Sequence, residues 1–464
     1  MSFHIDRSFL DVELKEFITR ILTITPIVSI DAESSIPKAV KFYRTTEENT
    51  YVVPFAFGRL FWVKNLGCQS ISSCYLRHRE KSLTFKGKLR IHQISIVQEA
   101  VSNLDRYGST VLAVDPGVGK TVMSICLSTK YLNINKKTLV LFKEKSLQLQ
   151  WKNTYEKLTN AVVVCVPSSA DKKKDRDNFN ERSSKADIII CMYQRIDRIS
   201  KDVIESIEIL IVDEADEFCT RDKVNSLLKT KPLIVIACSA TPERSDGMDK
   251  MLLLMCGDHR VERAVDNSDM RITRIITPFV PTIVKNPKTD KLEWHVVVKS
   301  LLENEDRNNM IAKLALNCVV SYGDKVLILT DRTFHVTLLQ ELIPSINDSE
   351  KEVTIDTMFG SQDEYKDSDI LIGTKSKIGR GFDELSFCSD FNNIRIDVLI
   401  LAISIKNTPT LRQCIGRIQR SENPKVFFLT DNHGVFDNHW YLCRRYYETR
   451  NVVFDFIEWD PSDF

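Results

Sequence analysis

Short apolar runs alternate with helix-length stretches along most of the chain. Runs that are apolar on both faces are typical of strands buried inside a parallel sheet, with helices in the connections between them. A first series comprises 111–114, 138–142, 162–166, 188–191, 209–212 and 233–237, and a second comprises 326–329, 370–372, 398–401 and 426–429. The pattern predicts an α/β protein with two tandem domains, each built on a parallel sheet.

The first 83 residues follow a different pattern. Apolar positions repeat at helical spacing between Phe9 and Leu22, and the stretches 39–44 and 51–57 alternate like strands around a polar turn. We find no residue pattern there that is typical of a chemical site. This segment is predicted to be a small N-terminal α+β domain with a packing role.

A polar stretch separates the two series of apolar runs. Residues 258–295 contain three prolines, which is typical of a hinge or a crossover between domains. The predicted domains are an accessory domain at 1–83, a first α/β domain at 84–262 and a second at 263–464.

A glycine-containing loop follows the run at 111–114 and precedes a helical pattern. Its sequence is Asp115-Pro116-Gly117-Val118-Gly119-Lys120-Thr121. Glycines let the backbone curl so that N–H groups point at phosphate oxygens, and a helix N-terminus favours the same anion. Lys120 would then reach the β- and γ-phosphates, and Thr121 would hold Mg²⁺. The full phosphate-loop pattern has glycine where this chain has Val114, but the strand–loop–helix context compensates for that departure.

An acidic cluster, Asp213-Glu214-Ala215-Asp216, follows the run at 209–212. A carboxylate at the carboxyl end of a strand beside a phosphate loop can bind Mg²⁺, directly or through water, and we assign this role to Asp213. Glu214 would then orient and deprotonate the attacking water. The alternative is a solvated acidic turn, which the preceding hydrophobic run and the spacing from the loop disfavour.

Two further segments complete the set of motifs. Ser239-Ala240-Thr241-Pro242 follows the run at 233–237, so its hydroxyls could hydrogen-bond the acidic cluster and sense the γ-phosphate. Near the end of the chain, Gln413 begins a segment that carries Arg417 and Arg420. Because the arginines are three residues apart, we expect both to project from one helix face as arginine fingers. The alternative is a basic surface face.

Composition and charge narrow the class of protein. Of the 464 residues, 43% are hydrophobic and 27% charged, which is ordinary for a globular chain and excludes collagen-like or long disordered sequences. The net charge of +1 argues against a histone-like coat on nucleic acid but allows a local basic track. Twelve scattered cysteines favour reduced, buried thiols over a zinc site. No apolar stretch approaches the ~20 residues of a membrane helix, so we expect a soluble intracellular protein.

Taken in this order, the motifs resemble those of superfamily 2 helicases and translocases over about residues 85–450. The resemblance begins at Leu89-Arg90-Ile91-His92-Gln93, where Gln93 would read adenine. It continues through Leu149-Gln150-Trp151, Met192-Tyr193-Gln194 and Asp306-Arg307-Asn308-Asn309. The resemblance implies two RecA-like domains with ATP between them, whose closing and opening would step the protein along one nucleic-acid strand.

The motifs and the resemblance together give the predicted site residues. Catalytic roles are expected for Asp213, Glu214, Gln413, Arg417 and Arg420. ATP is expected to contact Gln93, Asp115, Pro116, Gly117, Val118, Gly119, Lys120, Thr121, Gly381 and Asp383, and Mg²⁺ to be held by Thr121 and Asp213. Nucleic-acid contacts are expected at Lys143, Gln150, Tyr193, Gln194, Arg244, Thr374 and Lys375.

The spelling Asp213-Glu214-Ala215-Asp216 suggests a DEAD-box RNA helicase, but the other motifs differ from that group. The phosphate loop lacks the form Thr-Gly-Ser-Gly-Lys, and the arginine motif begins with Gln413. The set is more similar to the branch of phage recombination helicases, excision-repair translocases and the transcript-release helicases of large cytoplasmic DNA viruses, of poxvirus, asfarvirus or iridovirus type. This implies a DNA helicase in viral transcription termination, replication or recombination, located in the host cytoplasm and the virion.

Two alternatives stay open at this point. The protein could be an ATP-driven switch that remodels a polymerase or another protein complex without separating strands, or it could be an RNA helicase. The expected partners are single-stranded or branched DNA, with RNA as the alternative, and transcription or replication machinery. The expected cofactors are ATP and Mg²⁺, and no membrane partner is expected.

Overall fold

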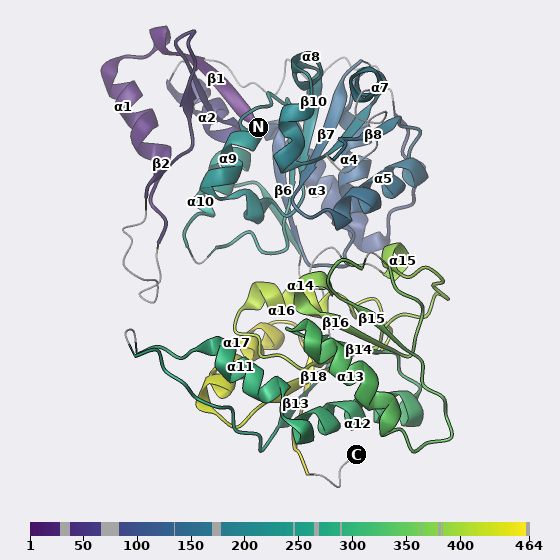
Figure 1. Cartoon of the computed structure of the whole chain (residues 1–464). Helices are drawn as coiled ribbons and strands as arrows, with labels where there is room; N and C mark the ends of the chain where they lie inside the picture. The colour runs from purple at the N-terminus through teal and green to yellow at the C-terminus, as the bar shows by residue number, and fades with distance from the viewer. Residues whose placement is uncertain are drawn as a thin grey trace. The chain divides into compact units, whose positions relative to one another are not determined.

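The structure is a computed structural model of the chain (Figure 1). It describes residues 1–27, 38–65, 83–133, 135–168, 178–244, 246–263, 269–287, 290–362, 364–378, 382 and 384–460. The chain divides into two compact units, one with residues 1–114 and 118–263 and the other with residues 115–117 and 264–464. None of the helices in the described residues is long and apolar enough to cross a membrane.

A seven-stranded parallel sheet forms the centre of the first unit, with the strand order β12-β6-β11-β10-β7-β9-β8. Its strands are β6 (Ser109–Val114), β7 (Lys137–Phe142), β8 (Val163–Cys165), β9 (Ile188–Met192), β10 (Ile207–Val212), β11 (Ile234–Cys238) and β12 (Arg260–Arg263). Six of them match the predicted apolar runs to within two residues. All residues of β6, β7 and β10 are buried, which explains why the last four residues of each strand are apolar instead of alternating.

Helices cover both faces of this sheet. The longest, α3, buries Ile96, Ala100 and Leu104, which recur every four residues on one side of the helix. It ends at Gly108, whose φ of 72° is the left-handed conformation that glycine adopts easily. The helices and short 3₁₀ turns are α3 (Ile91–Tyr107), α4 (Lys120–Tyr131), α5 (Ser146–Leu158), α7 (Phe179–Lys185), η2 (Tyr193–Arg198), α8 (Lys201–Glu205), η3 (Ala215–Phe218), α9 (Arg221–Leu227) and α10 (Lys250–Cys256).

The N-terminal segment packs against the first sheet's helices. Its buried Phe55 and Phe61 belong to the same hydrophobic core as Met251 and Met255 of α10. The expected strand at 51–57 stops at Pro54, and a helix begins at Phe55, because the burial of Phe55, Gly58 and Phe61 follows helical spacing. The elements are β1 (Ser2–Asp6), η1 (Arg7–Phe9), α1 (Val12–Ile21), β2 (Thr23–Ile24), β3 (Val40–Lys41), β4 (Arg44–Thr45), β5 (Thr50–Pro54) and α2 (Phe55–Asn65).

A second seven-stranded parallel sheet forms the centre of the second unit, with the order β15-β16-β14-β17-β18-β13-β19. Its alternate side chains enter two separate cores, one on each face. The strands are β13 (Arg271–Ile276), β14 (Val326–Thr330), β15 (Ile355–Met358), β16 (Ile370–Thr374), β17 (Val398–Leu401), β18 (Lys425–Thr430) and β19 (Val453–Glu458).

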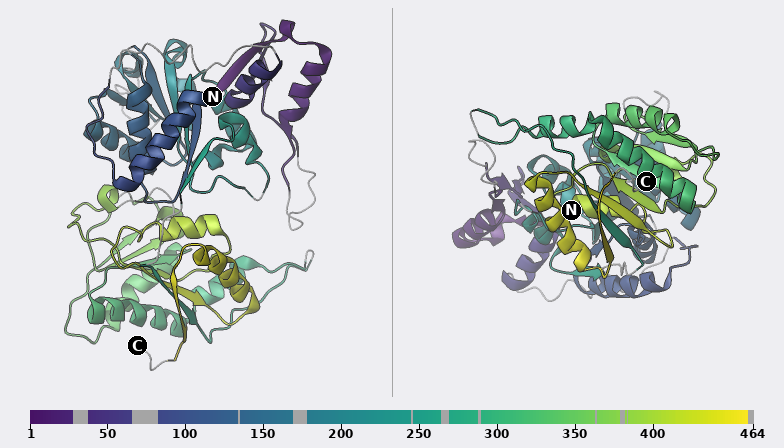
Figure 2. Two further views of the ribbon diagram at one scale, coloured as in Figure 1. Left: turned by 180° about the vertical axis from the view of Figure 1, so that it is seen from behind. Right: turned by 90° about the horizontal axis from the view of Figure 1, so that it is seen from below.

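The helices of the second unit cover the two faces of its sheet in two groups. The helices α11, α12 and α13 lie in front of the sheet in Figure 1, and α16 and α17 lie in front of it in the view from behind in Figure 2. Side chains of the first group fill one core, and those of the second group help to fill the other. The helices are α11 (Trp294–Leu302), α12 (Glu305–Tyr322), α13 (Thr333–Ser345), α14 (Lys375–Ile378), α15 (Glu384–Phe387), α16 (Thr408–Ile415) and α17 (Gly434–Glu448). The predicted fold class of two tandem RecA-like α/β domains with parallel sheets and a small N-terminal α+β part is confirmed.

The stretch 258–295 was predicted to be a hinge or crossover, and this prediction is wrong where it contains strands. Both β12 and β13 lie within it. Polar residues interrupt the apolar pattern of these strands, so the pattern did not predict them. In the middle of β13, for example, Arg274 is buried. Its charge is matched by an ion pair with Asp437, and its Nε donates to the Thr430 hydroxyl at 3.1 Å.

We expect the N-terminal segment to contribute directly to the stability of the first unit. Replacing Phe55, which is 1% exposed, in the variant Phe55→Ala should lower the free energy of unfolding by about 3–5 kcal/mol, because it opens a cavity in the shared core. Urea denaturation followed by intrinsic fluorescence would measure the loss. The matched control is Phe9→Ala, whose side chain is 64% exposed and should cost little. Equal losses in the two variants would contradict the shared core.

Candidate ATP site

The loop between β6 and α4 has the backbone that a phosphate cradle needs. Gly117 and Gly119 have φ values of 85° and 98°, which residues with a side chain rarely adopt. A Cβ atom at Gly119 would also lie 2.3 Å from Nε2 of Gln93. Both glycines are therefore required by the conformation of the loop, and Val114 ends the strand before it.

Gln93 connects the start of α3 to this loop. Its Oε1 accepts a hydrogen bond from the Arg90 backbone N–H at 2.9 Å, and its Nε2 donates to the Val118 carbonyl at 2.7 Å. The side chain is buried, with only 4% of the residue exposed. The amide thus fixes the loop against the helix, while the role predicted from the resemblance, reading adenine, stays a prediction.

Lys120 and Thr121 form the first turn of α4, directly after the loop. The Lys120 amino group donates to the Val114 carbonyl at 3.1 Å, so it points back across the loop toward the end of β6. The N-terminus of this twelve-residue helix carries a partial positive charge that adds to the charge of the amine. The two predicted phosphate and metal residues therefore lie together at one end of one helix.

Asp213 lies at the end of β10, and its carboxylate is held by an indole. Trp151 of α5 is completely buried, and its Nε1 donates to Oδ2 of Asp213 at 2.8 Å. The Glu214 backbone N–H donates to Oδ1 at 3.1 Å. Burial raises the pKa of Asp213, whereas the Trp151 hydrogen bond and the positive charge of Lys120 oppose that rise.

The rest of the acidic cluster is bonded to the segment after β11. Glu214 is in the left-handed conformation, with φ 50°, and begins the turn η3. The Ser239 hydroxyl donates to Oδ1 of Asp216 at 2.6 Å, and Arg244 donates to the Asp216 carbonyl at 2.9 Å. Burial, with the neighbouring charge of Glu214, raises the pKa of Asp216 to about 6. The hydrogen bond expected between the hydroxyl motif and the acidic cluster is therefore present.

These residues fit ATP with Mg²⁺. The loop offers backbone N–H groups and a lysine to the phosphates, and Mg²⁺ prefers one or two carboxylates together with phosphate oxygens and water over an all-protein cage. Within the described part of the chain, no group of three or more His, Cys, Asp or Glu could hold a metal ion by itself. The ten cysteines described there are free thiols, and eight of them are buried.

The predicted arginine fingers lie in the second unit, after α16. The helix ends at Ile415, and Arg417 and Arg420 follow it in turns with i→i+3 hydrogen bonds. The prediction that both project from one helix face is therefore wrong. Gly416, a poor helix former, directly follows the last helical residue. Arg417 is half-buried and donates to the Phe382 carbonyl, whereas Arg420 is exposed, and Gln413 lies within α16.

The predicted nucleic-acid residues of the first unit follow β7, β9 and β11 or lie on α5. Lys143 pairs with Glu217 at 2.9 Å, and Arg244 pairs with Asp246 at 2.6 Å. The Tyr193 ring packs edge-on against Phe218, with ring centroids 5.8 Å apart. Gln194 is exposed, and Gln150 is half-buried on α5.

In the second unit, Thr374 and Lys375 mark the end of β16. Thr374 is 3% exposed, and its hydroxyl accepts a hydrogen bond from Ser376. Lys375 pairs with Asp331, which follows β14, at 3.2 Å. The predicted residues Gly381 and Asp383 lie outside the described residues.

Sequence reasoning missed the partner of Asp213, the carboxylate that is predicted to hold Mg²⁺. Trp151 was noticed only as the end of a motif on α5, a helix distant in sequence from Asp213. A buried tryptophan usually finds an acceptor for its N–H. A tryptophan in a helix beside the sheet therefore indicated that a hydrogen-bond acceptor lies close to its indole. The acceptor could not be identified without the packing of α5 against β9 and α4.

Comparisons with known proteins find similar sequences and a similar fold. Residues 86–244 match the family model described as type III restriction enzyme, res subunit. The chain is 29% identical over 429 residues to "Putative helicase 161L" of Invertebrate iridescent virus 6, which covers 87% of this chain and 89% of the relative. It is 27% identical over 392 residues to "Putative helicase 055L" of Frog virus 3 (isolate Goorha), covering 83% and 82%.

Among solved structures, S. cerevisiae Dbp5 bound to RNA and ADP BeF3 matches with a TM-score of 0.53 at 12% identity. The match covers 78% of this chain and 89% of that one and indicates a common fold. The chain is similar over most of its length to viral proteins named as putative helicases, as the motifs predicted. It is therefore an ATP-hydrolysing enzyme.

We expect the Trp151–Asp213 hydrogen bond to orient the carboxylate that is predicted to hold Mg²⁺. Trp151→Phe keeps an aromatic ring but loses the N–H, so ATP turnover should fall roughly 10–100-fold, with more Mg²⁺ needed for half-maximal rate. Steady-state ATPase assays over a Mg²⁺ series would measure both changes. The control is Tyr155→Phe on the same helix, which loses a hydrogen bond to Ser128 instead. An unchanged Mg²⁺ dependence in Trp151→Phe would contradict this role.

The raised pKa of Asp216 predicts a pH effect on stability. Because the folded pKa of about 6 exceeds the ordinary 3.8, the protonated group favours folding, and this contribution is lost as pH rises from about 4 to 6. Asp216→Asn cannot ionise, so its stability relative to wild type should increase over that range, by up to about 3 kcal/mol. Thermal unfolding at pH 4 and pH 7 would measure the difference. A difference independent of pH would show that Asp216 is not perturbed.

Proposed function

We propose that this protein is a nucleic-acid-stimulated ATPase that translocates along or unwinds DNA. The observation that carries the proposal is the arrangement around Asp213, a buried carboxylate oriented by Trp151 and influenced by the charge of Lys120. This is the arrangement that phosphoryl transfer requires, since its catalysis consists of positioning and electrostatic stabilisation. ATP and Mg²⁺ are the cofactors of this proposal.

The individual roles follow from the chemistry of the side chains. Lys120 neutralises charge on the β- and γ-phosphates, and Thr121 and Asp213 hold the metal ion. Glu214 accepts the proton of the attacking water. Arg417 and Arg420 of the second unit stabilise charge on the transferred phosphoryl group, with Gln413 in the same motif.

The choice of DNA rests on the motifs and on the family match. The matched family is named after a restriction-enzyme subunit, which favours DNA. The residues proposed to contact the strand backbone are Lys143, Gln150, Tyr193, Gln194, Arg244, Thr374 and Lys375. Contacts to phosphate and sugar do not read sequence, as a motor that moves along any strand requires.

RNA is the second candidate substrate, and two observations favour it. The acidic motif reads Asp-Glu-Ala-Asp, and Dbp5, which shares the fold, was solved bound to RNA. The relatives in iridoviruses support a role for this protein in viral transcription, replication or recombination, in the host cytoplasm. Transcription or replication machinery is then the expected protein partner.

The experiment that tests this function compares ATP turnover without polymer and with single-stranded DNA, forked DNA or RNA. We expect the largest stimulation with DNA. Lys120→Ala should abolish turnover under all conditions while circular dichroism shows an intact fold, because the amine contributes to phosphate binding and not to the core. A strand-displacement assay beside a translocation assay separates unwinding from movement alone.

The results distinguish the candidates clearly. Stimulation by RNA alone would replace DNA by RNA in the proposal. A rate that no polymer changes would favour an ATP-driven switch acting on a protein complex. Wild-type turnover in Lys120→Ala would overturn the assignment of the phosphate loop.

A further inference from the structure

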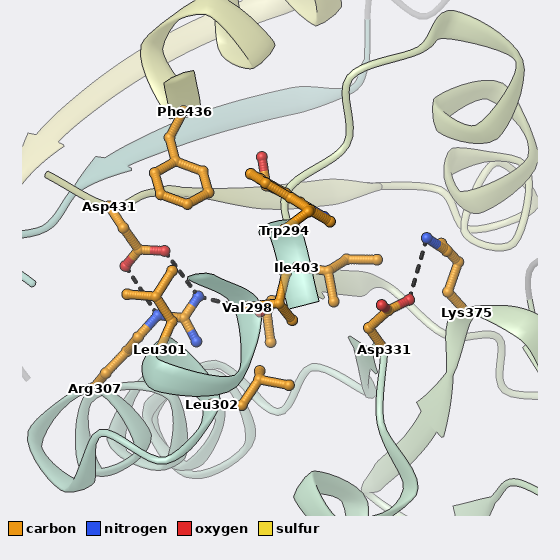
Figure 3. A pocket seen from close by; sticks show the side chains of 12 residues that line it. Trp294, Val298, Leu301, Leu302, Arg307, Asp331, Lys375, Ile403, Asp431 and Phe436 are labelled. Carbon is orange, nitrogen blue, oxygen red and sulfur yellow. Dashed lines mark hydrogen bonds and ion pairs between the residues drawn. The ribbon is translucent and has the colours of Figure 1, made fainter. Parts of the chain in front are cut away.

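A cavity of about 50 Å³ lies at the carboxyl edge of the second sheet, within the second unit. Residues that directly follow four parallel strands line it: Asp331 after β14, Lys375 after β16, Ala402 after β17 and Asp431 after β18. Side chains of α11 and Phe436, near the beginning of α17, also line it (Figure 3). In open α/β sheets, ligands bind outside the carboxyl ends of the strands, which is where this cavity lies.

One buried donor in the cavity wall has no acceptor. Arg307 is 2% exposed, and it pairs with Asp431 through Nε at 2.9 Å and Nη2 at 3.1 Å. Nη2 also donates to the Ala402 carbonyl, whereas Nη1 is buried without a hydrogen-bond partner among the described residues (Figure 3). A buried guanidinium nitrogen normally has a partner, so this atom indicates an acceptor supplied by a ligand.

The charge around the cavity decides which kind of acceptor fits. Its wall has two cations, Arg307 and Lys375, and two anions, Asp331 and Asp431, and each cation is paired with one anion. A phosphate would bring further negative charge close to two carboxylates in a partly desolvated site. A neutral carbonyl oxygen can accept the free N–H without that repulsion.

An aromatic ring lies at the mouth of the same cavity. Trp294, the first residue of α11, is 38% exposed. Its ring is held from behind by Phe436, with centroids 5.8 Å apart, and by His439 at 5.5 Å. The remaining lining consists of the aliphatic residues Val298, Leu301, Leu302 and Ile403, together with Ser404, whose hydroxyl is hydrogen-bonded to Nδ1 of His439 at 2.7 Å. A supported, half-exposed indole beside an apolar cavity is suited to stacking with a flat ring.

We propose that this cavity is a nucleobase subsite of the second unit. One base of the bound strand stacks on Trp294 and inserts its edge, so that a ring carbonyl accepts the hydrogen bond from Nη1 of Arg307. The volume admits the edge of a base and not a whole nucleotide. The inference rests on the proposed function and adds to it a contact with a base, beyond the contacts with the strand backbone.

The test compares two fluorescently labelled strands of equal length, oligothymidylate and an abasic strand with the same backbone. Equilibrium binding is followed by anisotropy with the full chain. Wild type should bind oligothymidylate more tightly than the abasic strand. Trp294→Ala should weaken binding of oligothymidylate roughly 5- to 150-fold and leave binding of the abasic strand unchanged, because only the first strand loses stacking. Trp294→Phe should restore most of the difference.

Two further variants make the test specific. Arg307→Lys keeps the charge opposite Asp431 but lacks Nη1, so it should also lower affinity for oligothymidylate alone. Tyr322→Ala removes an aromatic residue that is 69% exposed at the far end of α12, next to Lys425 at the start of β18. It should bind both strands as wild type does.

Each outcome bears on the subsite or on the function itself. If Trp294→Ala binds both strands as wild type does, or loses affinity for both equally, the subsite is overturned while the nucleic-acid motor stands. If wild type binds no strand and its ATPase responds to no polymer, the proposed function fails together with the subsite.

Discussion

Strands β6, β11 and β10 are parallel neighbours, so the segments that follow them meet at one edge of the first sheet. The loop that is predicted to bind phosphate follows β6, the hydroxyl motif follows β11, and Asp213 follows β10. Residues that follow different strands therefore become hydrogen-bonding neighbours, as Ser239 and Asp216 are. If one of these strands ran antiparallel, its motif would lie at the opposite edge and the site would not form.

Burying charged groups at the carboxyl edges of the two sheets costs free energy of folding. Asp213 is 6% exposed and Arg307 is 2% exposed, and an unpaired charge at such positions would be strongly destabilising. The indole of Trp151 and the carboxylate of Asp431 offset that cost. The same bonds hold the functional atoms in place, so stability and positioning depend on the same partners.

Much of the fold was predictable because parallel strands are buried on both faces and read as apolar runs. Strands that broke this rule were missed. The first residues of β13 and β12 are arginines, and β15 and β19 have half-exposed residues, so their runs are short or interrupted. Arg274 in β13 shows the reason, since its burial depends on Asp437, which lies far away in the sequence. The sequence contains both residues but does not indicate that they pair.

The sequence by itself determined the order of the motifs, the strand–loop–helix context of Lys120 and the carboxylates near the end of β10, because these depend on local spacing and on burial. The tertiary structure decided which side chains face each other: Trp151 and Asp213, Gln93 and Val118, Arg307 and Asp431. It also decided that α16 ends before Arg417 and Arg420. Such pairings depend on how helices pack on a sheet, and this packing is fixed by contacts between distant segments that no local pattern encodes.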